Sequence, residues 1–142
     1  MSVLCARDLG SKCATLFIAR LQSDGTLEYL NCAHVPPLVV TSGGQVRRLS
    51  ETNLPVGLLS HADYASARTR LQPGDHLIIV TDGVTEAENS AGEMFGDDRL
   101  VECAGADTGV EQLLHSVQVF CGDGALEDDC TVLNLTFLGA RQ

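Results

Sequence analysis

Basic residues are scarce in this sequence. Nine Lys and Arg stand against nineteen Asp and Glu, which gives a formal net charge of −10. Nucleic acids and anionic membranes bind clustered basic side chains, so we expect neither as a partner. Metal cations and basic protein surfaces remain compatible with this charge. The chain also lacks any run close to the roughly 20 apolar residues that a membrane-spanning helix needs.

Several motifs of known chemistry are absent as well. No two of the six cysteines are spaced as C-x-x-C, which argues against a structural zinc site. Residues 1–5 carry no cationic and long apolar signal pattern, so we expect a reducing, cytoplasmic location in which the cysteines are free thiols. The sequence contains no G-x-S-x-G, phosphate-loop or H-E-x-x-H motif. The four histidines show no ligand spacing, and His76 and His115 are interpreted as structural or surface residues.

What the sequence does contain is a series of short strand-like segments. The run 76–81, rich in β-branched residues, indicates a buried central strand, whereas 65–71 with its alternating arginines indicates an edge strand. Turn motifs rich in Gly, Pro, Asp and Ser separate these segments. Strands are expected at 14–21, 26–32, 38–41, 45–49, 65–71, 76–81 and 131–138.

Helical patterns appear only after the sixth of these strands. A short helix is expected over 97–104 with Asp97 as its N-cap, and a second helix after Thr108, which would form a capping box with Glu111. Gly122 is expected to end the second helix. The order of strands, two helices and a last strand predicts a single α+β domain over residues 1–142. The apolar stripe of the second helix consists of Val110, Leu113, Leu114, Val117 and Phe120.

Ten of the nineteen carboxylates fall in two segments, 82–98 and 123–129. The first segment follows the strand 76–81 and the second precedes the strand 131–138, so the carboxylates would converge if these strands pair. Mg²⁺ and Mn²⁺ prefer carboxylate oxygens as ligands, and Gly83 would permit a sharp turn after Asp82. A solvated acidic surface explains the clustering equally, and residue types alone leave both interpretations open. An EF-hand is excluded because Gly83 stands in the wrong place for the calcium loop.

The string "LQPGDHLIIVTDGVTEAENSAGEMFGDDRL" resembles the signature of bacterial SpoIIE-type serine/threonine phosphatases, part of the PPM or protein phosphatase 2C-like superfamily. Its L-x-P-G-D, T-D-G-V-x-E-A and G-E-x-F-G-x-x-R-L elements are all present. Upstream, "LEYLNCAHVPPLVV" resembles the family segment N-A-G-H-x-P-P, and "LPVGLL" resembles L-P-L-G. Downstream, "DDCTVLNL" resembles the terminal strand that begins D-D-x-T. The matches keep the family's order from about residue 14 to residue 138.

The resemblance implies an antiparallel β-sandwich flanked by helices. It also implies a reaction in which water activated by two Mn²⁺ or Mg²⁺ ions hydrolyses phosphoserine or phosphothreonine without a covalent enzyme intermediate. The usual substrate in the family is a small phosphorylated regulatory protein of the anti-anti-sigma type. Residue by residue, it implies three metal ligands, Asp82, Asp128 and Asp129, of which Asp82 and Asp128 are also catalytic. It further implies Gly83, Glu86 and Ala87 in a regulatory segment, and Asn31 and His34 in a loop near the site.

Two features depart from the family pattern. The segment G-G-D-x-x-D, which supplies an aspartate bridging both metals, has no match here, because Asp8 fits neither its neighbours nor its spacing. The family's N-A-G-H reads Asn31-Cys32-Ala33-His34, so its glycine is replaced.

From the first departure we expect a chain that corresponds to the C-terminal two-thirds of the family domain, with an incomplete metal site. Missing strands would leave a sheet edge unpaired and one face of the core uncovered. We therefore expect a homodimer, or a partner that supplies the missing strands. The alternative function is a truncated or degenerate phosphatase-like module that binds a signalling partner without hydrolysing it.

Overall fold

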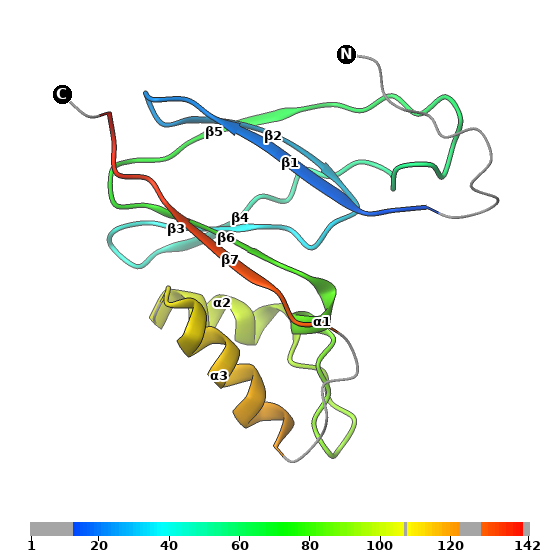
Figure 1. Ribbon diagram of the computed structural model, residues 1–142, viewed down its shortest axis with the longest axis vertical. Helices are drawn as coiled ribbons and strands as arrows, with labels where there is room; N and C mark the ends of the chain where they lie inside the picture. The colour runs from blue at the N-terminus through cyan, green and yellow to red at the C-terminus, as the bar shows by residue number, and fades with distance from the viewer. Residues whose placement is uncertain (1–12, 107, 123–128, 141–142) are drawn as a thin grey trace.

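Two antiparallel sheets lie face to face in the computed structural model, which describes residues 13–106, 108–122 and 129–140 (Figure 1). The first sheet has the order β1-β2-β5, and it consists of β1 (Leu16–Leu21), β2 (Thr26–Cys32) and β5 (Ala67–Arg70). β5 lies at the end of this sheet, as expected for an edge strand. The predicted α+β class with an antiparallel sandwich is confirmed.

The second sheet has four strands in the order β4-β3-β6-β7. It consists of β3 (Leu38–Val40), β4 (Val46–Arg48), β6 (His76–Val80) and β7 (Val132–Thr136). β6 lies between β3 and β7, which confirms the predicted central strand. β6 and β7 pair antiparallel from His76 opposite Thr136 to Val80 opposite Val132. The last strand of the chain is therefore fixed along the strand that precedes the acidic segment.

Of the three helices in the described residues, two lie over the outer face of the four-stranded sheet, and the first is a single turn at the tip of β6 (Figure 1). The three are α1 (Asp82–Thr85), α2 (Gly96–Ala106) and α3 (Val110–Cys121). None of the helices that the structure describes is long and apolar enough to cross a lipid bilayer.

The predicted helix ends need two corrections. α2 begins at Gly96, so Asp97 lies in its first turn and is not the cap. The capping box of Thr108 and Glu111 is wrong, because the N-cap of α3 is Gly109 and no side chain caps this end. The Thr108 carbonyl instead accepts a hydrogen bond of 2.7 Å from the side-chain amide of Asn134 on β7. Gly122 ends α3 with a φ of 64°, as predicted.

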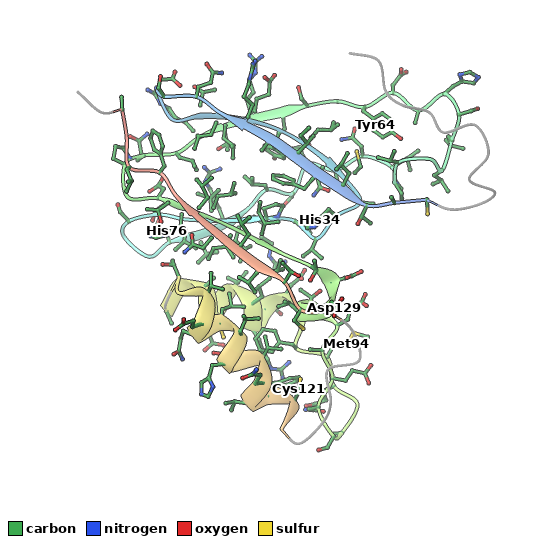
Figure 2. The ribbon with its side chains drawn as sticks, viewed as in Figure 1. His34, Tyr64, His76, Met94, Cys121 and Asp129 are labelled. Atoms are coloured by element: carbon green, nitrogen blue, oxygen red, sulfur yellow. The ribbon has the colours of Figure 1, made fainter. Side chains whose placement is uncertain are left out.

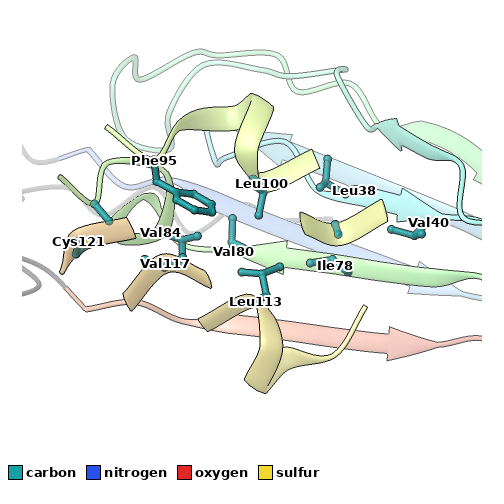
Figure 3. Close-up of a cluster of buried hydrophobic side chains, with 12 residues drawn as sticks. Leu38, Val40, Ile78, Val80, Val84, Phe95, Leu100, Leu113, Val117 and Cys121 are labelled. Carbon is teal, nitrogen blue, oxygen red and sulfur yellow. The ribbon is translucent and has the colours of Figure 1, made fainter. Parts of the chain in front are cut away.

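The core forms two layers because the central strands are apolar on both faces. Along β3, Leu38 and Val40 face the helices, and Val39 faces the other sheet. Figure 3 shows the layer between helices and sheet, where Leu113 of α3 packs near Ile78. The layer between the two sheets contains Leu27, Tyr29, Val39, Leu49, Leu71, Leu77 and Phe137.

Leu113 and Val119 offer a matched test of the helical layer, since both lie on α3 but are 1% and 66% exposed. Leu113→Ala should lower the free energy of unfolding by about 2–5 kcal/mol, because it leaves a cavity among buried side chains. Val119→Ala should change it by no more than about 0.5 kcal/mol. Urea unfolding followed by circular dichroism measures both values. Equal effects of the two substitutions would show that α3 does not pack as described.

Candidate metal centre

Asp82 lies at the tip of the central strand β6, where a single helical turn replaces the loop that the sequence suggested. The Asp82 carbonyl accepts hydrogen bonds from the Glu86 amide at 2.8 Å and from the Thr85 hydroxyl at 3.1 Å. The Gly83 amide donates to the Asp82 carboxylate at 3.0 Å. The turn thus orients a carboxylate that is exposed to solvent.

The chain turns sharply after Asp82, as predicted, but as a helical turn and without a positive φ at Gly83. Gly83 lies inside α1 with ordinary helical geometry, and the described glycines with positive φ are elsewhere in the chain. The residue is buried, and its carbonyl accepts a hydrogen bond of 2.9 Å from the thiol of Cys130. Gly83 therefore ties α1 to the segment that leads into β7.

Thr81 makes the second connection between the two acidic segments. Its hydroxyl donates to the Asp129 carbonyl at 3.0 Å and accepts from the Thr131 amide at 2.9 Å. Its own amide donates to the Thr131 carbonyl at 3.1 Å. These bonds extend the β6–β7 pairing by one residue and fix the main chain of Asp129 beside Asp82.

The structure therefore brings two of the three predicted metal ligands to one corner. Asp82 and Asp129 are both exposed, and Figure 2 shows Asp129 next to α1. Asp128 lies outside the described residues, so its role as a ligand stays a prediction. The roles of Thr81 and Cys130 were not predicted. The threonine of the T-D-G motif was the available signal, since a hydroxyl at the end of a strand can bind the neighbouring main chain.

The remaining carboxylates of the segment 82–98 do not gather at this corner. Asp97 and Asp98 form ion pairs of 3.4 Å each with Arg48 of β4. The Glu93 carboxylate accepts a hydrogen bond of 2.9 Å from the Asn89 side chain. Glu86 is exposed at the end of α1, and Ala87 is buried.

The donor chemistry of the corner fits a hard divalent cation in type but not in number. Carboxylate oxygens are the preferred ligands of Mg²⁺ and Mn²⁺. Within residues 13–106, 108–122 and 129–140, no group of three or more Asp, Glu, His or Cys is placed to hold a metal ion. The described residues thus supply part of a ligand set, and further oxygens have to come from elsewhere.

Asn31 and His34 form a closed loop after β2. The buried Asn31 side chain accepts a hydrogen bond from the His34 amide at 2.8 Å and donates to the His34 carbonyl at 3.0 Å. The His34 ring packs 6.3 Å from Phe17, centroid to centroid, and Nδ1 lies 2.9 Å from the Val35 carbonyl. These contacts hold the loop itself, and their predicted role near the metal site stays a prediction.

Ala33, inside this loop, adopts a φ of 55°. This left-handed conformation brings Cβ too close to the following carbonyl in residues other than glycine. It is also the position at which the resembled family pattern carries glycine. Ala33 therefore adds backbone strain that a glycine at this position would not have.

A family model described as Stage II sporulation protein E (SpoIIE) matches residues 2–138 of the chain. The chain belongs to the SpoIIE family. Protein IcfG of Synechocystis sp. is 32% identical over 126 residues, which cover 84% of this chain and 20% of that protein. The stage II sporulation protein E of Bacillus subtilis is 25% identical over 138 residues, or 93% of this chain and 16% of that protein. The chain thus spans a fifth or less of these relatives.

Several solved structures share the fold of this chain. The PP2C phosphatase domain of B. subtilis SpoIIE, solved with a fragment of its regulatory domain, matches with a TM-score of 0.74 and 23% identity over 89% of this chain and 39% of that chain. The SiaA-PP2C domain of Pseudomonas aeruginosa matches with a TM-score of 0.67 and 21% identity, covering 80% and 47%. The RsbU and RsbW domains of a Mycobacterium tuberculosis protein match with a TM-score of 0.68 and 25% identity. This match covers 90% of this chain and 37% of that chain.

The substitution Ala33→Gly tests the backbone strain in this loop of the SpoIIE-family chain. The substitution should raise the free energy of unfolding by about 1 kcal/mol, since glycine adopts positive φ without strain. Ala19→Gly is the control, because Ala19 is an exposed residue of β1 outside the positive-φ set. It should lower stability by about 0.5–1 kcal/mol. Thermal and urea unfolding provide both values. A lower free energy of unfolding for Ala33→Gly would show that Ala33 is not strained.

Proposed function

We propose that this chain is a metal-dependent serine/threonine phosphatase domain of the SpoIIE type. Its substrate is a phosphoserine or phosphothreonine on a small regulatory protein of the anti-anti-sigma type. Supporting structures of similar fold include a SpoIIE phosphatase domain described as Mn presoaked and RsbX in complex with magnesium. The observation that supports the proposal is the corner at which Thr81 bonds the main chain of Asp129 and Gly83 bonds the thiol of Cys130, next to Asp82.

In this proposal, Asp82, Asp128 and Asp129 are the metal ligands, and Asp82 and Asp128 are catalytic. Two Mn²⁺ or Mg²⁺ ions, when bound, would supply a water nucleophile for in-line attack on phosphorus and would offset the charge of the phosphate. The protein's part is to hold the carboxylates in place before binding. The Gly83 amide fixes the Asp82 carboxylate, and the Thr81 hydroxyl fixes the main chain before β7.

Gly83, Glu86 and Ala87 are proposed to relay changes in the helices to the metal corner. The Glu86 amide binds the Asp82 carbonyl at 2.8 Å, and the Ala87 carbonyl binds the Phe95 amide at 2.8 Å. Phe95 in turn packs in the helical core. A shift of the segment before α2 would therefore reach Asp82 through a few backbone contacts.

A calorimetric Mn²⁺ titration tests the metal corner directly. The unaltered chain should bind Mn²⁺, and Asp82→Asn should weaken binding by at least about tenfold, because it removes a charged oxygen ligand. Glu88→Gln is the matched control, since Glu88 is another exposed carboxylate of the same acidic segment. Equal losses in both variants would mean that Mn²⁺ responds to the general acidity of the surface.

The same titration separates the two candidate functions. The partner-binding module is favoured by the incomplete ligand set of the described residues. Specific Mn²⁺ binding with turnover of a phosphoserine peptide would support the phosphatase. Absence of specific binding would support a module that recognises a signalling partner without hydrolysis.

Two exposed sheet edges support association with a second copy or with a partner that supplies strands. β1 and β7 are the end strands of the two sheets and lie on the same side of the sandwich (Figure 1). Their apolar residues include Ile18 at 51%, Leu133 at 50% and Leu135 at 36% exposure. Unpaired strands with apolar side chains promote pairing with another chain. We propose a homodimer formed through this side; the single domain over 1–142 and the cytoplasmic location stay predictions.

Sedimentation velocity and size-exclusion chromatography test the association. The unaltered chain should form dimers at tens of micromolar. The double substitution Leu133→Lys with Leu135→Lys should shift it toward monomer, since lysine opposes edge pairing. Val119→Lys should leave the dimer intact because Val119 is an exposed residue of α3. A monomer of the unaltered chain over this range would contradict the proposal.

A further inference from the structure

Charge is divided unequally between the two parts of the molecule. Residues 1–81 contain seven basic and six acidic residues, whereas residues 82–142 contain two basic and thirteen acidic residues. The strands of both sheets except β7 come from the first part, and the helices come from the second. The whole chain carries a net charge of −10, and most of this negative charge lies in the second part. The strands of the first part therefore repel an anionic partner less than the helices do.

A polar cleft of about 490 Å³ lies on this part of the molecule. It is lined by residues 47–53, which comprise the end of β4 and the segment after it, and by residues 65–69, which lead into and include part of β5. Neither Asp82 nor Asp129 lines it. The charged residues of the lining are Arg47, Arg48, Arg68 and Glu51, and its uncharged polar residues are Tyr29, Ser50, Thr52, Asn53, Ser66 and Thr69.

Arg47 is the first of two cationic side chains in the cleft that could bind an anion. Its side chain is exposed and donates a hydrogen bond of 3.2 Å to the Arg70 carbonyl, which is a neutral acceptor. In the described part of the chain Arg47 forms no ion pair, whereas Arg48 is paired with Asp97 and Asp98. Arg47 thus places a positive charge between the end strands β4 and β5. Glu51, the one acidic residue of the lining, forms no ion pair with it among the described residues.

Arg68 adds a second exposed cation at the same cleft. It forms an ion pair of 3.0 Å with Glu28, and 71% of its side chain is exposed. Glu28 is also paired with Arg20 at 2.8 Å, so one carboxylate is shared by two guanidinium groups. The hydrogen bonds and charge of Arg68, followed by those of Arg20, lower the pKa of Glu28. The sharing leaves positive charge at Arg68 for an additional anion.

The wall of the cleft can bind an extended main chain as well as an anion. Among the described strands β5 pairs only with β2, so its other edge presents backbone groups to an added strand. The hydroxyl groups of Ser50 and Thr69 line the cleft and can bind a peptide backbone, whereas the Asn53 side chain already bonds the backbone of Asn31 and Ala65. Tyr29 is buried, and its burial raises the pKa of its hydroxyl.

We propose that this cleft binds an extended acidic segment of a partner protein, with its carboxylates against Arg47 and Arg68 and its main chain along the free edge of β5. Binding here does not use the metal corner and goes beyond the proposed phosphatase activity. It would bring a partner to the domain irrespective of its phosphorylation.

Fluorescence anisotropy with a labelled decapeptide of alternating Glu and Val tests this proposal, in the presence of EDTA so that metal plays no part. The chain should bind this peptide and should bind the Gln-Val peptide at least about tenfold more weakly. Arg47→Gln and Arg68→Gln should each weaken binding of the Glu-Val peptide several-fold. Raising the salt concentration should weaken it as well, since exposed charges are screened.

Arg20→Gln is the matched control, because Arg20 pairs with the same Glu28 but does not line the cleft. Its affinity should stay within about twofold of the unaltered chain. The proposal is overturned if Arg20→Gln and Arg68→Gln have equal effects, or if a single-stranded oligonucleotide or equimolar inorganic phosphate displaces the peptide. Circular dichroism of each variant excludes unfolding as the cause of a loss, and Arg68→Gln keeps the test valid if Arg47→Gln unfolds.

Discussion

The pairing of β6 with β7 is the constraint on which the rest of the structure depends. β6 is the central strand, and β7 is the segment that returns to it after all three helices. One face of this pair supports the helices through Ile78, Val80 and Val132, and the other faces the second sheet through Leu77 and Phe137. Removing β7 would therefore expose both layers of the core together.

The same pairing explains why an acidic corner can exist in a domain with so much negative charge. Ionised carboxylates repel each other, and flexible ones move apart. Here they are attached to main chain that Thr81 and Cys130 hold through hydrogen bonds to neutral groups. The geometry of the corner is thus set by backbone contacts, which do not weaken with the charge on Asp82 and Asp129. Such a corner is formed in advance of any cation.

The strands and their succession along the chain could be predicted because they follow from short-range patterns. Alternation and turn residues located β2 at its observed bounds, and the apolar run located β6 within one residue. The helix ends were harder to predict, because Thr108 bonds Asn134 of β7 rather than Glu111 of the adjacent helix. Likewise, no local pattern shows that Asp97 and Asp98 are paired with Arg48. Contacts between residues distant in sequence decided both cases.

Arg47 and Arg48 are neighbours on a strand of three residues, and their side chains point to opposite faces of the sheet. Arg47 reaches the main chain of β5, and Arg48 reaches the first turn of α2. A slip of β4 by one residue would turn each guanidinium to the wrong face and would break both contacts at once. A strand this short has few backbone bonds to define its alignment. The contacts of the two arginines therefore stabilise the observed register of β4 against β3 over a shifted one.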